Sequence, residues 1–186
     1  LWLKNVLLEG AALVPLLLAG PGLPQGKSID TPVSHADLVA TLLDAAGLPK
    51  PAPLRGHSLL RDGHPGVAYA ESHSEGNCTG SFLIRKGDWK YLYFTGDEPL
   101  LFNLKTDPGE FQNLAGKPQH AALQRELHAH LTSLVDPDKV TEAAFRRQAE
   151  VLQSIARRLT RDKFYEELVG RLGPAQARIL TLLHHA

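Results

Sequence analysis

The stretch SFLIRKGDWKYLYFTGDEPLLFNL, residues 81–104, decides the fold of this chain. It consists of three short runs rich in aromatic and aliphatic residues, separated by Gly-Asp pairs that begin at Gly87 and Gly96. Runs of this length joined by Gly-Asp turns are typical of β-hairpins. With one more run upstream, the stretch predicts a four-stranded antiparallel sheet. Its expected strands are residues 67–72, 81–86, 89–94 and 99–104.

One amphipathic helix is expected before this sheet, starting at Ser34. Ser34 followed by Asp37 approximates a capping box, in which the serine and the acid satisfy backbone groups of the first turn. Leucines at positions 38, 42 and 43 lie on one helical face. Gly47 and Pro49 follow, so the pattern predicts a helix that begins at Ser34 and ends before Gly47.

Beyond the sheet, the chain is expected to be helical. A stripe with helical spacing is formed by Leu123, Leu127, Leu131 and Leu134. His128 and His130 are expected on the solvent side of the same helix. The expected helices cover residues 118–135, 136–159, 164–172 and 174–185.

The segment before the first helix carries a continuous apolar run, VPLLLA at residues 14–19. A continuous run is typical of a strand that is covered on both faces of an α/β sheet. We therefore expect an α/β strand and helix in residues 1–62, an antiparallel sheet and helix in 63–135, and a helical tail in 136–186. A chain that opens beside an interior strand and contains no Met is expected to be processed, trimmed or part of a longer protein.

The composition excludes several classes of protein. Of 186 residues, 43% are hydrophobic, which is enough to bury a core and excludes global disorder. Twenty basic residues balance twenty acidic ones, so the charge expected of a nucleic-acid-binding protein is absent. A single Cys excludes a disulfide framework. No apolar run reaches the ~20 residues of a membrane span, and no targeting signal is visible, which leaves cytoplasm and periplasm open.

Four segments, in this order, resemble the C-terminal part of a formylglycine-dependent sulfatase of the alkaline phosphatase superfamily, as in arylsulfatases and choline-sulfatases. They read LWLKNVLLEGAALVPLLLAGPG, DTPVSHADLVATLLDAAGLP, YAESHSEGNCTGSFLIRKGDWKYLYF and LLFNLKTDPGEFQNLA. The resemblance covers roughly residues 1–135. It implies the C-terminal portion of an alkaline-phosphatase-like sulfatase fold, and an enzyme that hydrolyses sulfate esters.

The first of these segments implies a role for Lys4. It is similar to the family pattern L-W-x-K-x-x-x-x-E-G-x-x-x-V-P-L, with Lys4 at the lysine and Glu9 at the glutamate. By this resemblance, Lys4 contacts the sulfate group. An ammonium group beside a sulfuryl oxygen stabilises the charge that develops as the ester bond breaks.

The nucleophile and the metal ligands of the family are not found in this chain. Cys78 is followed by Thr79, Gly80 and Ser81, which does not match the C-x-P-x-R or C-x-A-x-R motif of the cysteine that becomes formylglycine. The acidic pairs that hold Ca²⁺ or a similar divalent ion are also absent. We therefore expect formylglycine and the metal in the complete enzyme, and an inactive segment here.

The segment YAESHSE at residues 69–75 suggests contacts with the group that carries the sulfate. By the resemblance, Glu71, His73 and Glu75 lie at the mouth of the substrate pocket, where carboxylates would favour a cationic group. The alternative is structural: Glu71 would pair with Arg85 or Lys86 across the hairpins.

The hairpin at residues 85–90 carries basic and aromatic side chains, which could form a binding strip. Alternation along half-exposed strands predicts the same residues and is the favoured interpretation. On that interpretation Lys90 faces solvent, and Lys90→Ala should leave turnover within a few-fold of wild type.

Three functions are consistent with these features. The first is a sulfatase that acts on a small-molecule sulfate ester, completed by an N-terminal catalytic region. The second keeps the fold but acts on phosphonate monoesters or phosphodiesters. The third is a non-catalytic assembly module, and in any of the three the helical tail is a candidate surface for a homo-oligomer.

Overall fold

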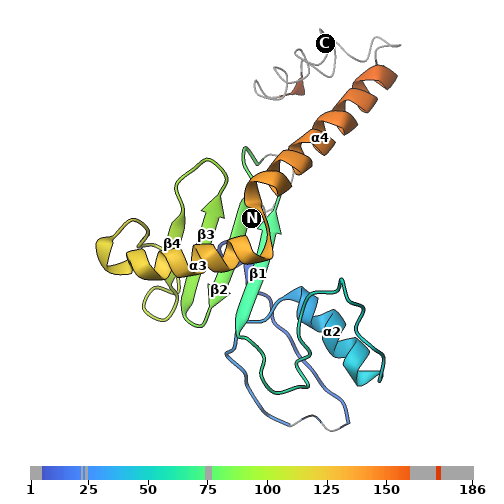
Figure 1. Ribbon diagram of the computed structural model, residues 1–186, viewed down its shortest axis with the longest axis vertical. Coiled ribbons are helices and arrows are strands. Elements are labelled where there is room, and N and C mark those ends of the chain that lie inside the picture. The colour runs from blue at the N-terminus through green and yellow to red at the C-terminus, as the bar shows by residue number, and fades with distance from the viewer. Residues whose placement is uncertain (1–5, 22, 24, 74–76, 160–170, 173–186) are drawn as a thin grey trace. The chain divides into compact units, whose positions relative to one another are not determined.

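The computed structural model describes residues 6–21, 23, 25–73, 77–159 and 171–172. It divides into two compact units, Leu1–Asp138 and Lys139–Ala186. The first unit contains a four-stranded antiparallel sheet, in which each strand pairs with the next along the chain (Figure 1). Its strands are β1 (Val67–Ser72), β2 (Ser81–Lys86), β3 (Trp89–Phe94) and β4 (Leu100–Asn103).

The predicted sheet is confirmed, and its turns explain why it could be predicted. Lys86 pairs with Trp89 across a two-residue turn, in which Gly87 has a φ of 56°. Gly96, in the turn between β3 and β4, has a φ of 78°. Glycine adopts these left-handed conformations without the steric penalty that a Cβ brings. The last strand is shorter than expected, at Leu100–Asn103.

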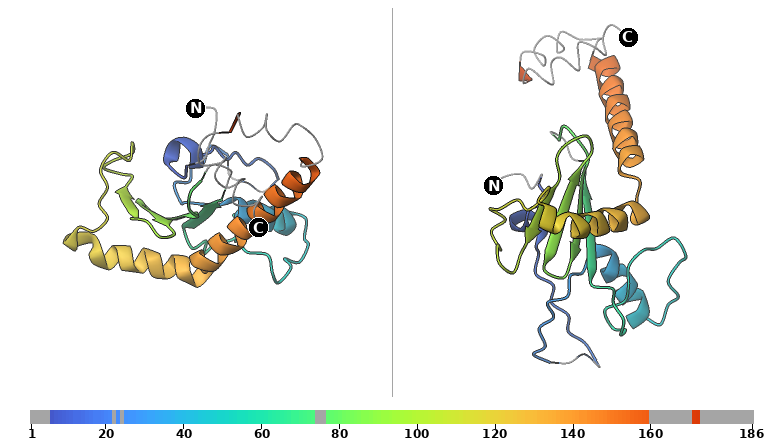
Figure 2. Two further views of the ribbon diagram at one scale, coloured as in Figure 1. Left: turned by 90° about the horizontal axis from the view of Figure 1, so that it is seen from above. Right: turned by 60° about the vertical axis from the view of Figure 1, so that its left-hand side comes forward.

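One face of the sheet is covered by α3 (Ala121–Leu134), which is preceded by the short 3₁₀ helix η1 (Pro118–His120). Helix α3 packs on β2 and β3, and its Leu127 and Leu131 side chains are fully buried in this contact. Leu123 and Leu134 are half-buried, so the predicted leucine stripe is confirmed. The opposite face of the sheet is covered by the N-terminal segment, with the four-residue helix α1 (Glu9–Ala12) (Figure 2).

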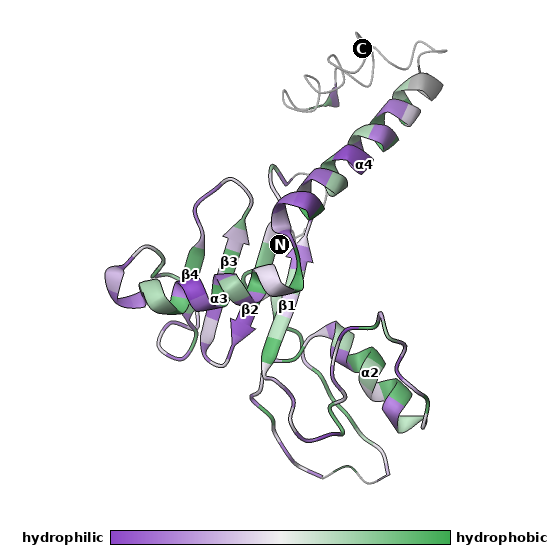
Figure 3. Cartoon of the chain, in the orientation of Figure 1, coloured by the Kyte–Doolittle hydropathy of each residue, from purple (hydrophilic) through white to green (hydrophobic). Residues whose placement is uncertain are grey.

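The helix α2 (His35–Ala45) forms as predicted. Asp37, Ala40 and Thr41 are buried, whereas Leu42 is 69% exposed. Asp37 and Thr41 are buried because the loop at residues 55–61 hydrogen-bonds to this face, and much of α2 is hydrophobic by residue type (Figure 3). Of the three leucines that share a face, Leu38 and Leu43 are partly buried and Leu42 is exposed.

Asp37 connects the start of α2 to the loop at residues 55–61 through hydrogen bonds. Its carboxylate accepts hydrogen bonds from the backbone N–H of Ser34 at 2.7 Å and of His57 at 2.8 Å. The first of these bonds confirms the predicted role of Asp37 in the helix cap. Burial alone would raise the pKa of Asp37, but these hydrogen bonds outweigh it, so the pKa lies below its ordinary value.

Asp37 should therefore make the stability of the fold pH-dependent. A carboxyl group with a depressed folded-state pKa stabilises the fold above its unfolded pKa, about 3.9, and this contribution disappears as the pH falls through the folded-state pKa. Asp37→Asn should cost roughly 1–3 kcal/mol at pH 7 and less at pH 3. Urea unfolding of both proteins at the two pH values measures this. An equal difference at both values would contradict the role of the charge.

The strand expected at residues 14–19 is wrong for this structure: the segment is extended but pairs with no described strand. Its side chains are exposed, and Leu17 is 94% exposed. A β-strand needs a neighbour for its backbone hydrogen bonds, and the described sheet consists of β1 to β4 alone. A continuous apolar run alone therefore does not establish a strand among the described residues.

The helix α4 (Pro137–Leu159) confirms the helix expected at 136–159 and lies largely in the second unit. The helices expected at 164–172 and 174–185 fall outside the described residues, except for positions 171 and 172. No helix in the described ranges is both long and apolar enough to cross a membrane.

Candidate functional site

The N-terminal segment lies against the sheet face opposite α3. Leu7 and Leu8 pack on a buried cluster formed by Leu83, Leu92 and Phe102. Lys4, the residue expected to contact sulfate, falls outside the described residues. The described part of its segment, from residue 6 onward, is held on this sheet face by apolar contacts.

A second set of contacts is ionic and begins at Glu9, the first residue of α1. The Glu9 carboxylate accepts hydrogen bonds from Lys90 Nζ at 2.9 Å and from Arg85 Nη1 at 3.0 Å. Glu110 follows β4 in the chain, and its Oε1 lies 2.7 Å from Lys90 Nζ. We call these four residues, Glu9, Arg85, Lys90 and Glu110, the charge clamp.

The charge clamp overturns the expectation for Lys90. Its side chain is 0% exposed, not solvent-facing. Both sheet faces are covered here, and Lys90 points to the same side as Leu92, under the N-terminal segment. A lysine in this position cannot serve as a neutral control in kinetic experiments.

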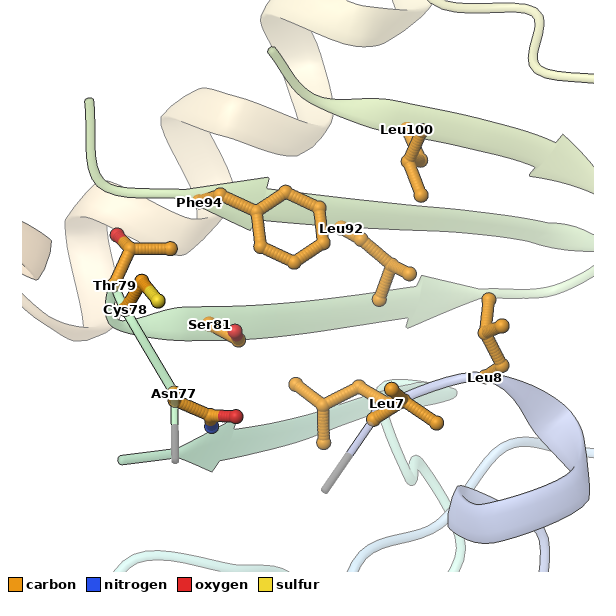
Figure 4. A pocket seen from close by; sticks show the side chains of 10 residues that line it. Leu7, Leu8, Asn77, Cys78, Thr79, Ser81, Leu92, Phe94 and Leu100 are labelled. Carbon is orange, nitrogen blue, oxygen red and sulfur yellow. The ribbon is translucent and has the colours of Figure 1, made fainter. Parts of the chain in front are cut away.

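A hollow of about 290 Å³ opens on the same sheet face (Figure 4). Its apolar wall includes Leu7, Leu8 and Leu92, which lie on one side of the sheet in Figure 4. Asn77 and Thr79, from the loop between β1 and β2, add polar groups. The hollow thus joins the segment that follows Lys4 with the loop that follows Glu75, which itself lies outside the described residues.

Glu71 and His73 lie elsewhere. Glu71 pairs in register with Phe82, and the His73 ring packs edge-on against Phe82 at 5.2 Å, on the face that α3 covers. Glu71 accepts a hydrogen bond from the Tyr69 hydroxyl. Burial, reinforced by this bond, raises the pKa of Tyr69, so its hydroxyl stays protonated at neutral pH. The structure therefore does not bring Glu71 and His73 into the hollow.

The expected pairing of Glu71 with a basic residue of β2 is wrong. Arg85 pairs with Glu9, and Lys86 pairs with Glu126 of α3 at 2.6 Å. The reason is that β2 directs Arg85 toward the N-terminal segment and Lys86 toward α3, since alternate residues point to opposite faces. The two basic residues of β2 are therefore paired with Glu9 and Glu126, and not with Glu71.

The sequence interpretation also placed His128 on the solvent side of its helix, which is wrong. His128 is half-buried, and its Nδ1 lies 3.2 Å from the Tyr91 hydroxyl. Its ring packs against Tyr93 at 5.1 Å. Burial raises the pKa of Tyr91 to about 12, so this hydroxyl keeps its proton.

The sequence patterns do not predict a role for Ser72, which contacts a residue that lines the hollow. Asn77 Nδ2 donates to Ser72 Oγ at 3.2 Å, and Asn77 lines the hollow. Strand alternation carries the signal, because Ala70 contacts the cluster beneath Leu7 and Leu8, and Ser72 points the same way. Cys78, in the same loop, is exposed.

The comparisons with known proteins agree with this architecture. A family model described as "N-sulphoglucosamine sulphohydrolase, C-terminal" matches residues 1–137. Arylsulfatase K of Danio rerio is 34% identical over 156 residues, which cover 77% of this chain and 29% of that protein. Choline-sulfatase of Rhizobium meliloti (strain 1021) is 38% identical over 136 residues, which cover 69% of this chain and 26% of that protein. The solved structure of a 2-O GAG sulfatase matches with a TM-score of 0.57 at 31% identity. The match covers 69% of this chain and 30% of that structure's chain.

The fold and these matches define the C-terminal region of a sulfatase, within the alkaline phosphatase superfamily. The chain belongs to the family of N-sulphoglucosamine sulphohydrolase C-terminal domains. It spans less than a third of the length of the relatives named above.

Membership of this family implies formylglycine and a metal ion in the complete enzyme. No group of three His, Cys, Asp or Glu side chains that could hold a metal ion occurs among the described residues. The residues described here therefore do not fit the metal.

Proposed function

We propose that this chain forms the C-terminal part of a sulfuric ester hydrolase, in which Lys4 contacts the sulfate group of a small-molecule ester. The observation that carries the proposal is the family match over residues 1–137, which includes the LWLK and EG elements of the first segment. The contacts of Leu7, Leu8 and Glu9 support it, since they hold the chain just after Lys4 on a rigid sheet.

In this proposal, Lys4 stabilises negative charge on the sulfuryl oxygens as the ester bond breaks. Formylglycine and Ca²⁺, or a similar ion, are held by an N-terminal catalytic region. The part of this chain that the structure describes supplies the scaffold that places Lys4 against that region. The hollow between residues 6–8 and 77–79 lies next to this segment and could receive an apolar part of the ester or of the catalytic region.

Two exposed apolar surfaces support the proposal that residues 1–62 complete an α/β catalytic domain. They are the extended segment that contains Leu17 and the face of α2 that contains Leu42. Apolar surfaces of this kind usually mark contacts with another part of a protein. The helical tail from residue 136 is proposed as a surface for a homo-oligomer.

Glu71, His73 and Glu75 are proposed to contact the group that carries the sulfate. Glu71 is exposed at its edge strand, where an incoming ligand can reach it. The relative named choline-sulfatase acts, by its name, on an ester of a cationic alcohol. A carboxylate such as Glu71 suits a cationic group of this kind, by direct charge attraction.

The proposed activity is tested on the complete enzyme that contains this chain. Values of kcat/KM for 4-nitrophenyl sulfate and choline sulfate are compared with those for a phosphonate monoester and a phosphodiester of the same alcohol. We expect the sulfate esters to be preferred by at least about tenfold. The reverse preference would favour the phosphonate or phosphodiester hydrolase, and no hydrolysis of any ester would favour the assembly module.

Residues 1–186 on their own should bind no divalent ion tightly and hydrolyse no aryl sulfate. The reason is that Ca²⁺ needs several converging oxygen ligands, and the nucleophile motif is missing from the sequence. Calorimetry with Ca²⁺ and an assay with 4-nitrophenyl sulfate measure this. Micromolar Ca²⁺ binding, or turnover above the buffer background, would contradict it.

A further inference from the structure

The charge clamp buries charged groups that a protein normally keeps in water. The Lys90 side chain is completely buried, and the Glu110 side chain is 4% exposed. Two acidic and two basic residues balance one another, with separations of 2.7 to 3.0 Å. Apolar residues of similar volume often stabilise a fold as well as such a buried ion pair, or better. Stability alone therefore does not explain the clamp.

Glu110 is also held in an unusual backbone conformation. It is the one described non-glycine residue with a positive φ, 56°, which a residue with a Cβ adopts at a cost. The turn around it is fixed by Asp107, whose carboxylate accepts the N–H groups of Phe111 and Gln112. This conformation aims the Glu110 carboxylate at Lys90 and at the N–H of Glu9, which donates to Glu110 Oε2 at 2.6 Å.

The charge clamp therefore holds the segment around Glu9 through two separate sets of contacts. Glu9 is bound through its side chain by β2 and β3, and through its backbone by the turn after β4. Helix α1 has four residues, and a helix of this length does not persist without tertiary contacts. Lys4 lies five residues before Glu9, so it cannot lie further from it than about 18 Å.

We propose that Lys90 and Glu110 are positioning residues, which act through Glu9 to hold the N-terminal segment so that Lys4 meets the substrate anion. This inference rests on the proposed function of Lys4. It assigns a role to two residues from the sheet and the following turn that do not themselves contact the substrate. Backbone strain at Glu110 and burial of Lys90 are the structural signs of that role.

The test uses Glu110→Gln in the complete enzyme, because glutamine keeps the shape and an acceptor oxygen but removes the charge. Lys90→Met is the second variant, and Lys86→Met on the same hairpin is the matched control. With 4-nitrophenyl sulfate, at a temperature where circular dichroism shows all variants folded, kcat should fall about tenfold in Glu110→Gln and further in Lys90→Met. KM should stay within about twofold, and Lys86→Met should match wild type.

Two further readouts separate positioning from a merely structural role. Amide hydrogen exchange at residues 6–12 should become at least about tenfold faster in Glu110→Gln, while exchange in β2 and β3 stays unchanged. In a Lys4→Ala background, Glu110→Gln should lower kcat by less than about twofold, since residues that act through one another are not additive.

Unchanged exchange at residues 6–12, or a full tenfold loss of kcat in the Lys4→Ala background, would overturn the positioning role. If the wild-type enzyme hydrolyses no sulfate ester, the proposed function fails separately. The exchange experiment needs no substrate, and in that case it decides alone whether the clamp holds the segment.

Discussion

Lys4→Ala in the complete enzyme should lower kcat/KM for a sulfate ester by roughly 10²–10³, which corresponds to about 2.7–4 kcal/mol of lost transition-state stabilisation. The reason is that the ammonium group meets the sulfuryl oxygens mainly as charge develops on them. The fold should hardly change, because a lysine beside an anion site contributes little to a hydrophobic core. Steady-state kinetics with 4-nitrophenyl sulfate, together with circular dichroism, measure both effects.

Lys4→Arg is the informative companion variant. A planar guanidinium keeps the charge but replaces a compact ammonium group, so it should restore only part of the activity. Lys86→Ala is the control, since Lys86 pairs with Glu126 on the α3 face, away from the N-terminal segment. Turnover near that of wild type in Lys4→Ala would mean that LWLK was wrongly aligned with the family pattern.

The sheet and the helices could be predicted because their signals are local. Gly87 and Gly96 fix the turns, and the leucine stripe of α3 shows which helix face packs on the sheet. The strand expected at residues 14–19 rested on an apolar run alone. A strand also needs a paired neighbour, and the described sheet of β1 to β4 offers none to this segment. The burial of Asp37 and Thr41 in α2 depends on hydrogen bonds from the loop at residues 55–61, which helical spacing does not show.

The charge clamp is harder to predict because it joins residues that are far apart in sequence. Glu9 lies 81 positions from Lys90 and 101 from Glu110. A weak signal exists in the strand WKYLYF, where Lys90 shares its face with Leu92 and Phe94. A single lysine on an otherwise apolar face indicates a buried charge that needs an acidic partner. The sequence does not show which acid that is.

Lys90→Ala should destabilise the fold by about 3–5 kcal/mol, because the Lys90 side chain is buried and does not face solvent as the sequence predicted. Removing the ammonium group leaves the carboxylates of Glu9 and Glu110 close together and shielded from water, with Arg85 as the remaining counter-charge. Breaking a buried ion pair from one side carries this cost because the charge left behind is uncompensated. Urea unfolding, followed by circular dichroism, measures the free energy of unfolding of the variant and of wild type.

Lys86→Ala is the matched control for this measurement, because Lys86 also belongs to the hairpin and also pairs with a glutamate. The Lys86 and Glu126 side chains are 49% and 56% exposed, so water screens the pair, and its loss should cost no more than about 1 kcal/mol. Adding Glu110→Gln to Lys90→Ala should recover part of the lost stability, since one of the two uncompensated carboxylates is then neutral. Equal losses in Lys90→Ala and Lys86→Ala, or no recovery in the double variant, would show that burial of the Lys90 charge does not govern the stability of this sheet face.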